Sequence, residues 1–364
     1  MDPDEGDRRR NMAKKIALLH ISGKRDVERK NKTKFSAFFV TAVILFAIGL
    51  QPARAAGPEY LIPGGEAVGI CVEADGVIIA EITGVETAEG AVTPARDAGL
   101  KPGDVIIKIG TNDVKSGEDL LKALTNADDE TTVQVRRGQE VKQMRIKPAV
   151  NQNGQKSIGV LARDKMAGVG TITFYDSESE TFGALGHEIC DADTQILFPL
   201  KEGNIMRTEI TQCVKADGST PGRLYGVFTL SDSIGEIEKN CVCGIYGELE
   251  DKSVCTDNPL PVADAAEIKP GEAKILSTVD SGGVKEYDIE ITRIYPDSDD
   301  ETRNLMIKIT DEDLIEKTGG IVQGMSGSPI IQDGKLIGAV THVLVNDSSR
   351  GYGIFIENML DAAA

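Results

Sequence analysis

Short apolar runs alternate with glycine-containing turns along most of the chain from residue 58 onward. Runs of this length that are rich in Val and Ile and bounded by turn residues are typical of β-strands. Helical spacing is clear in two stretches, Gly117–Thr125, with Ser116 as a candidate N-cap, and 311–317. The pattern therefore predicts a mainly β protein with few helices.

A polar linker at 151–156 divides this pattern into two regions. The first, 58–150, combines short runs with the helix at 117–125 and predicts a small β-rich domain. The second, 151–364, holds about ten runs and predicts a β-barrel or a pair of barrels. Its runs are 168–174, 181–185, 195–198, 223–230, 242–246, 287–294, 304–309, 329–331, 336–345 and 353–356.

The segment at 35–50 is apolar and carries no charge, and four basic residues lie just before it. It is slightly shorter than the ~20 residues that span a bilayer, although flanking residues can complete a helix. Small residues at 53–56 then resemble a cleavage signal. A buried core helix is the alternative, but the basic flank favours export. We expect a cytoplasmic basic segment at 1–34, a signal peptide or membrane anchor at 35–56, and export of everything after Gly57.

The net charge of −18 averages two unlike parts of the chain. Residues 1–34 carry a net charge of +5, whereas residues 57–364 carry −24. A strongly acidic body repels phosphate backbones and acidic lipid surfaces. We therefore expect no nucleic-acid binding, and membrane contact only through the N-terminal segment.

Six cysteines are scattered beyond residue 57, and the chain has only three histidines. Export permits disulfides, but the wide spacing favours mostly free, buried thiols. With no paired CxxC motif, a zinc site is not expected. The sequence predicts neither a metal nor a cofactor.

The stretch 95–106, ARDAGLKPGDVI, resembles the PDZ family, in which a short helix ends at a Gly, a Pro-Gly turn follows and a strand begins. PDZ domains bind an extended peptide, usually a C-terminus, as an extra strand at a sheet edge. The resemblance implies a PDZ domain at 58–150 whose groove has a helix around Leu120, Leu121 and Leu124 as one wall, unless these leucines are core residues. Its carboxylate-binding loop would contain Val68, Gly69 and Ile70.

The most informative motif is GMSGSP at 324–329, which lies just before a strand-like run. Glycines permit the tight turn that exposes a serine oxygen and aligns backbone amides as an oxyanion hole. Gly-x-Ser-Gly-x-Pro is the arrangement of chymotrypsin-like serine peptidases, so we expect a chymotrypsin-like double β-barrel. In it Ser326 would attack, and the amides of Gly324 and Ser326 would hold the oxyanion. A simple Gly/Ser hairpin explains the hexapeptide equally well.

A serine nucleophile needs a base, and the three histidines limit the choice. His20 lies in the predicted cytoplasmic segment. His187 follows a strand and its turn, a position that presents a side chain at a cleft. His342 lies inside an alternating strand, where a structural role is the simpler interpretation, although that strand can line the cleft.

The third member of a triad orients the imidazole and stabilises its positive charge. Asp311 leaves a predicted strand 15 residues before Ser326 and is attractive for that reason. It could equally cap the helix that follows. Asp191 and Asp193, close to His187 in sequence, are rivals.

Three stretches together resemble the SpoIVB family, the stage IV sporulation protein B peptidases (S55-type) of endospore-forming bacteria. They are 168–176 (GVGTITFYD), 183–187 (GALGH) and the 324–329 motif with the GAVTHV run after it. A membrane segment followed by a PDZ domain matches that family too. The resemblance implies a serine peptidase domain at 151–364 with His187 as base, Asp311 as acid and Ser326 as nucleophile.

The resemblance also implies a role in signalling during sporulation. Such a peptidase would be exported across the forespore inner membrane into the intermembrane space. There it would cleave a membrane-bound regulator of an intramembrane protease, and itself, so that a late mother-cell sigma factor is activated. Two alternatives stay open: a PDZ scaffold with a degenerate peptidase domain, and a broad quality-control protease. In the latter the PDZ domain usually follows the protease domain, whereas here it precedes it.

Overall fold

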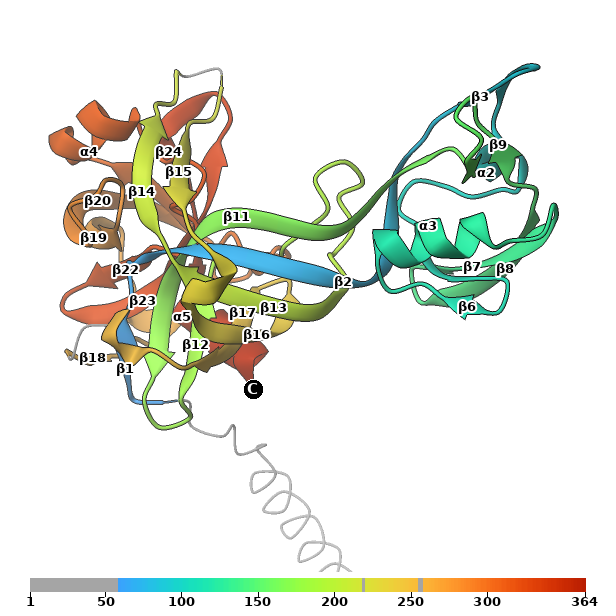
Figure 1. Cartoon of the computed structure of the whole chain (residues 1–364). Helices are drawn as coiled ribbons and strands as arrows, with labels where there is room; N and C mark the ends of the chain where they lie inside the picture. The colour runs from blue at the N-terminus through green and yellow to red at the C-terminus, as the bar shows by residue number, and fades with distance from the viewer. Residues whose placement is uncertain (1–57, 218–219, 255–257) are drawn as a thin grey trace, which may run out of the picture. The chain divides into compact units, whose positions relative to one another are not determined.

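The computed structural model describes residues 58–217, 220–254 and 258–364 (Figure 1). The predicted basic segment at 1–34 and the predicted signal peptide or anchor at 35–56 lie outside these residues. Within the described ranges, no helix is long and apolar enough to cross a membrane. The chain divides into two units at residue 57, and the described residues belong to the second.

A first ring of six paired strands contains residues from both predicted regions. Strand β11 pairs with β12 on one side and with β2 on the other, and this second pairing closes the ring. Buried Phe182, Phe198 and Ile205 fill it. In pairing order the strands are β2 (Ala67–Ile82), β13 (Leu200–Arg207), β16 (Ser233–Cys241), β17 (Gly244–Leu249), β12 (Thr181–Ala184) and β11 (Val160–Asp176).

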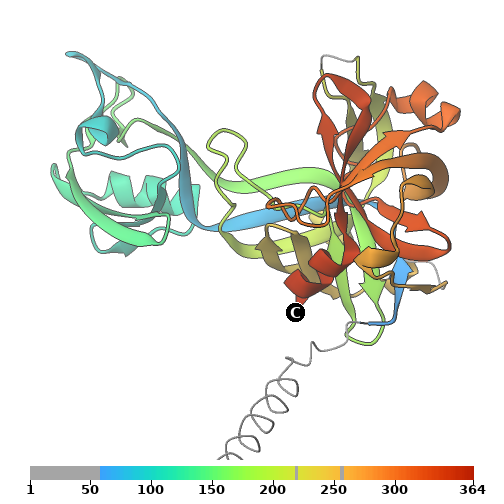
Figure 2. The same cartoon turned by 180° about the vertical axis from the view of Figure 1, so that it is seen from behind.

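A second closed barrel follows in the chain, drawn in orange to red and seen from the other side in Figure 2. Every second residue of its strands points inward, and the interior holds aliphatic side chains such as Ile289, Ile307 and Ile330. In pairing order its strands are β19 (Gly271–Ser277), β20 (Lys285–Ile294), β21 (Leu305–Ile309), β24 (Asp347–Phe355), β23 (Lys335–Leu344) and β22 (Pro329–Gln332). The predicted mainly β fold, with a β-barrel in the second region, is confirmed.

The PDZ region has its own buried cluster, which includes Ile79, Ile106 and Leu124. Val77 in the second half of β2 and Val160 at the start of β11 also pack in this cluster. Its remaining elements are β3 (Val85–Thr87), β4 (Gly90–Val92), α2 (Pro94–Asp97), β5 (Val105–Ile109), β6 (Asn112–Asp113), α3 (Gly117–Thr125), β7 (Thr131–Arg137), β8 (Glu140–Ile146), β9 (Ala149–Val150) and β10 (Lys156–Ser157).

Local signals in the PDZ region are confirmed. Helix α3 has the predicted bounds, and the amide of Asp119 donates to Ser116 Oγ at 3.2 Å, which makes Ser116 its N-cap. The turn before β5 contains Gly99 at φ +84° and Gly103 at φ +86°, conformations that favour glycine. Buried Asp104 holds this turn by accepting two hydrogen bonds, at 2.6 and 2.7 Å, from the Arg137 guanidinium.

The predicted carboxylate-binding loop is wrong. Val68, Gly69 and Ile70 lie inside β2, where they pair with β11 on one edge and with β13 on the other. No sheet edge is free there for a peptide strand, and Val68 and Ile70 belong to the core of the first barrel. Strand pairing places residues 67–73 in the first ring, although the PDZ domain was predicted to begin at residue 58.

The other elements connect or cover the barrels. The predicted strand at 195–198 forms only an isolated bridge between Cys190 and Leu197, and the C-terminal helix was not predicted. These elements are β1 (Tyr60–Pro63), β14 (Glu209–Val214), β15 (Arg223–Val227), η1 (Leu230–Asp232), η2 (Lys252–Val254), β18 (Leu260–Pro261), η3 (Ala265–Glu267), α4 (Glu312–Thr318) and α5 (Ile356–Ala363).

Candidate active site

Ser326 lies in the tight loop that joins α4 to β22. Gly324 and Gly327 flank it with φ angles of +106° and +95°, a region that side-chain-bearing residues rarely adopt. A Cβ atom on Gly327 would also lie 2.1 Å from the carbonyl oxygen of Thr171. Both glycines are therefore required for the loop to turn as it does.

The first barrel holds this loop through two buried threonines of β11. The amide of Thr171 donates to the Ser326 carbonyl at 3.0 Å, and its hydroxyl donates to the Gly324 carbonyl at 2.8 Å. The hydroxyl of Thr173 donates to the Gly327 carbonyl at 2.8 Å. A strand of one barrel thus fixes the candidate nucleophile of the other.

The hairpin of β14 and β15 holds the same loop from another direction. The amide of Leu224 donates to the Gln323 carbonyl at 2.9 Å, and the amide of Gln323 donates to the Gly222 carbonyl at 2.9 Å. A side-chain bond from Arg223 Nε to Gln323 Oε1, at 2.7 Å, adds to this pairing. The residue just before Gly324 is therefore held on both its backbone and its side chain.

Two backbone amides in the loop are left without an acceptor. Among the hydrogen bonds of the described residues, none is donated by the amide of Gly324 or of Ser326, whereas the amides of Met325 and Gly327 are bonded to Val322 and Val340. Gly324 and Ser326 both line a cavity of about 480 Å³. Unpaired donors beside a nucleophile are suited to stabilise an oxyanion.

Both candidate histidines line this cavity with Ser326. Their ring centroids lie 5.2 Å apart, with a tilt of 41°. The hydroxyl of Ser326 donates to the Thr341 carbonyl at 2.9 Å, and no hydrogen bond joins Ser326 to either of these described histidines. The structure thus brings the predicted nucleophile and base into one cavity, in which the Ser326 hydroxyl is hydrogen-bonded to the Thr341 carbonyl and not to a histidine.

The tautomer of His187 follows from its partner. Its Nδ1 lies 2.9 Å from the backbone carbonyl oxygen of Glu188, which can only accept, so Nδ1 carries the proton. In the neutral ring Nε2 then has a free lone pair. His342 Nδ1, by contrast, is buried without a hydrogen-bond partner among the described residues.

Both imidazoles are held in the neutral form. Burial lowers the pKa of His187, against the opposing effect of the Glu188 carbonyl. Burial, with help from His187 and Arg303, lowers the pKa of His342 to about 4, and Asp300 opposes this shift. A general base must be unprotonated at the working pH, and both rings meet that requirement at neutral pH.

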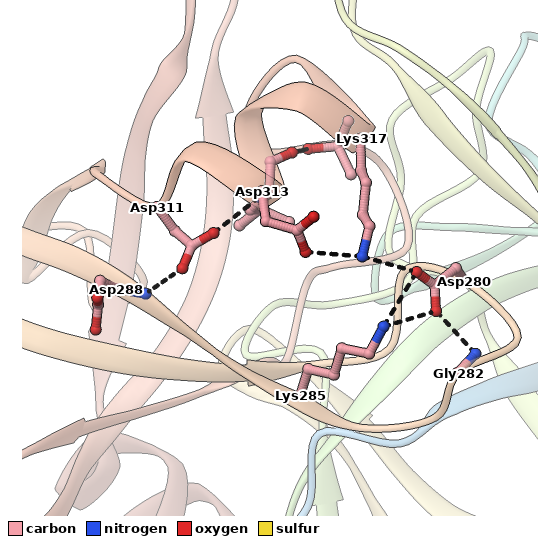
Figure 3. Close-up of polar contacts among 9 residues, drawn as sticks. Asp280, Gly282, Lys285, Asp288, Asp311, Asp313 and Lys317 are labelled. Carbon is pink, nitrogen blue, oxygen red and sulfur yellow. Dashed lines mark hydrogen bonds and ion pairs between the residues drawn. The ribbon is translucent and has the colours of Figure 1, made fainter.

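Asp311 is not brought to these histidines. Its carboxylate caps α4 by accepting from the amide of Leu314 at 2.9 Å, and it also accepts from the amide of Asp288 at 3.3 Å (Figure 3). It does not line the cavity. The capping alternative therefore describes its contacts, and its role as a triad acid stays a prediction.

The two rival aspartates have a different partner. Both Asp191 and Asp193 pair with the guanidinium of Arg163, and Asp191 also accepts from Thr194. Neither is bonded to His187. The group that orients His187 is a backbone carbonyl, which sequence reasoning missed and could not have found, because every residue carries one.

No metal site accompanies these residues. Within the described ranges, no three His, Cys, Asp or Glu side chains gather in a way that would hold an ion. The five cysteines in those ranges, Cys71, Cys190, Cys213, Cys241 and Cys243, are free thiols.

Comparison with known proteins gives two family matches and several partial likenesses. Residues 68–147 match the PDZ domain model. A 60-residue stretch is 40% identical to the mitochondrial serine protease HTRA2 of Bos taurus and covers 16% of this chain and 13% of that protein's length. The chain thus spans only a small part of that relative.

Comparison with solved structures gives partial matches. The PDZ domain of the SdrC-like protein from Listeria monocytogenes is 26% identical, with 25% of this chain and 90% of that one covered and a TM-score of 0.20. The Rv3671c protease from M. tuberculosis in its active form is 17% identical, with 54% and 71% covered and a TM-score of 0.28.

The match that decides the family covers more than half of the chain. Residues 154–360 match the model described as SpoIVB peptidase S55, and this range contains Ser326, both cavity histidines and the whole second barrel. The chain therefore belongs to the SpoIVB peptidase family S55 and is a serine peptidase with a PDZ domain.

Proposed function

We propose that the protein is an exported serine endopeptidase in which Ser326 is the nucleophile and His187 the general base. One observation carries this assignment. His187 is fixed by the Glu188 carbonyl with Nε2 unprotonated, in the same cavity as Ser326 and two unpaired amides. Nucleophile, base and oxyanion donors are the three groups that acyl transfer needs.

Catalysis begins when the Ser326 hydroxyl leaves the Thr341 carbonyl and gives its proton to Nε2 of His187. The oxygen attacks the peptide carbonyl, and the amides of Gly324 and Ser326 stabilise the resulting oxyanion. His187 then returns the proton to the departing amine. A water molecule, activated in the same way, hydrolyses the acyl-enzyme.

The orienting group sets the expected rate. A carbonyl has a partial negative charge, so it stabilises an imidazolium less than a carboxylate does. We propose a slow enzyme, suited to one regulatory cleavage rather than to bulk digestion. Its proposed substrates are a membrane-bound regulator of an intramembrane protease and the chain itself, cleaved between the forespore membranes; the resemblance of the motifs supports this proposal.

Labelling with a fluorophosphonate probe tests the function directly. The purified full chain is expected to gain one probe mass, located at Ser326 by peptide mapping, because only an activated serine attacks phosphorus. Boiled protein is the control. A folded chain that stays unlabelled would favour the alternative of a peptide-binding scaffold.

Two substitutions at Asp311 test whether this residue acts as a helix N-cap or as the acid of a catalytic triad. Asn is as good an N-cap as Asp and gives up only the longer, exposed bond from the Asp288 amide, so Asp311→Asn should change stability little, and the geometry predicts that peptidase activity falls less than about tenfold. Asp311→Ala removes the cap and should destabilise the protein by about 1 kcal/mol. If Asp311 acts as the acid, Asp311→Asn would instead lower kcat by about 10⁴-fold at unchanged thermal stability.

A further inference from the structure

The cavity beside Ser326 is lined mainly by aliphatic side chains from both barrels. Ile70, Val72 and Met166 belong to strands of the first barrel, while Val322 and Val343 come from the nucleophile loop and from β23. Its volume of about 480 Å³ falls within the range of about 300–1,000 Å³ that is usual for ligand pockets. It is large enough to hold a substrate side chain next to the scissile bond.

Few groups that line this cavity can carry a charge. The two histidines are neutral at neutral pH, and burial together with Glu188 raises the pKa of Cys190 to about 11, so its thiol is neutral as well. Glu188 is the one carboxylate among the described residues that line the cavity, and no Lys or Arg is among them. A cationic side chain therefore finds one potential partner there, and an anionic one finds none.

A second cavity, of about 360 Å³, shares five residues with the first, among them Gly168, Val169 and Gly324. Tyr225 and Phe228 also line it. An extended peptide that crosses the oxyanion loop can place neighbouring residues in the two cavities. The first cavity thus needs to hold only a short part of the substrate.

We infer that the enzyme selects peptides by an uncharged apolar side chain that enters the cavity of Ile70, Val72, Met166, Val322 and Val343 beside Ser326. The inference rests on the proposed function and adds the substrate class to it. Burial of an apolar side chain in such a cavity is favourable, whereas an unpaired charge there loses its hydration. One methylene in a hydrophobic pocket is worth about 10–200-fold in selectivity, so discrimination by a whole side chain is measurable.

The experiment uses the purified full chain and synthetic peptides with randomised positions, and cleavage sites are identified by mass spectrometry. Sites with Leu, Ile, Val or Met next to the scissile bond should exceed sites with Lys, Arg, Asp or Glu by at least about tenfold. A preference for Lys or Arg, which Glu188 would then explain, overturns the inference, and so does the absence of any preference.

Two matched substitutions locate the selectivity. Val343→Glu places a carboxylate in the cavity and should lower cleavage at apolar sites by at least about tenfold relative to cleavage at Lys sites. Val345→Glu adds the same charge two residues further on, at a side chain that is 65% exposed and outside the cavity, and should leave the preference unchanged. If Val343→Glu fails to fold, Val343→Thr should still weaken apolar preference several-fold. An unaltered preference in a folded Val343 variant counts against the cavity.

Fluorophosphonate labelling of each preparation keeps the two claims apart. A folded chain that neither reacts with the probe nor cleaves any peptide contradicts the proposed function itself. A chain that reacts and cleaves, but without preference for apolar residues, contradicts only the inference about the cavity.

Discussion

Ser326→Ala is expected to abolish peptide cleavage, with a loss of kcat of about 10³–10⁶-fold. Ser326 lines the cavity together with both neutral histidines, and the substitution removes the attacking oxygen itself. Residual turnover would come from the two unpaired backbone amides, of Gly324 and of residue 326, and from substrate binding, all of which remain in the variant.

The measurement is the rate of peptide cleavage by equal amounts of folded protein. Self-processing of the full chain, followed by intact mass, is a second readout. Ser326 makes one side-chain hydrogen bond, to the Thr341 carbonyl, so the variant should unfold within a few degrees of the parent protein.

Ser328→Ala is the matched control, because Ser328 lies two residues away in the same loop. Its hydroxyl donates to Ser277 Oγ at 3.0 Å in a buried site and does not line the cavity. It should lower stability by about 1 kcal/mol and leave kcat within a few-fold. Equal loss of activity in the two variants would mean that the loop, rather than the Ser326 oxygen, had been damaged.

The features that the sequence predicted correctly depend on local chemistry. The bounds of α3 follow from Ser116 and the leucine spacing after it, both within one short segment. The turn at Ser326 follows from glycines that adopt positive φ angles. The scarcity of histidine made His187 one of few possible bases, and the structure places it in the cavity of Ser326.

The features that were missed depend on pairing between distant segments. The run containing Val68 fits a PDZ loop or a barrel strand equally well when read alone. Only its pairing with β11 and β13, more than ninety residues away in the sequence, buries it in the first barrel. The role of Asp311 is ambiguous because its local signal is too general. A carboxylate between a strand and a helix can cap that helix whether or not its second oxygen contacts a distant residue.

The sequence reveals least about the backbone groups that hold the candidate site. The Glu188 carbonyl orients His187, and the Thr341 carbonyl accepts the Ser326 hydroxyl. No pattern of side chains identifies either one. Interpretation of the sequence could therefore name a candidate nucleophile and a candidate base, but not the groups that hold them.

His187→Ala is expected to lower kcat by about 10³–10⁶-fold, as much as the loss of the nucleophile, since the two groups act as a unit. His342→Ala should cost far less, because the assigned base with its fixed tautomer remains in place. The two imidazoles line the same cavity and lie 5.2 Å apart, so the pair of variants controls for the loss of a buried ring. The reverse order of effects would make His342 the base.

The pH profile of kcat/KM gives an independent check on the same assignment. Protonation of the base stops the reaction, and burial makes His187 bind that proton only at a pH below the ordinary value of 6.5. Activity should therefore persist as the pH falls from 7 through 6.5 and decline only below that. Burial lowers the pKa of His342 to about 4, so this ring also stays neutral as the pH falls from 7 through 6.5.

In His342→Ala, activity should still decline only below pH 6.5. Burial is what lowers the pKa of His187, and His342 carries no charge at this pH whose loss could change that pKa. An acid limb at or above pH 6.5 in the parent protein would show that the base is solvated during turnover. The reaction would then use a conformation of the cavity in which water reaches His187. The pH at which kcat/KM declines thus distinguishes a base that is already buried in the free enzyme from one that takes up its working environment only when substrate binds.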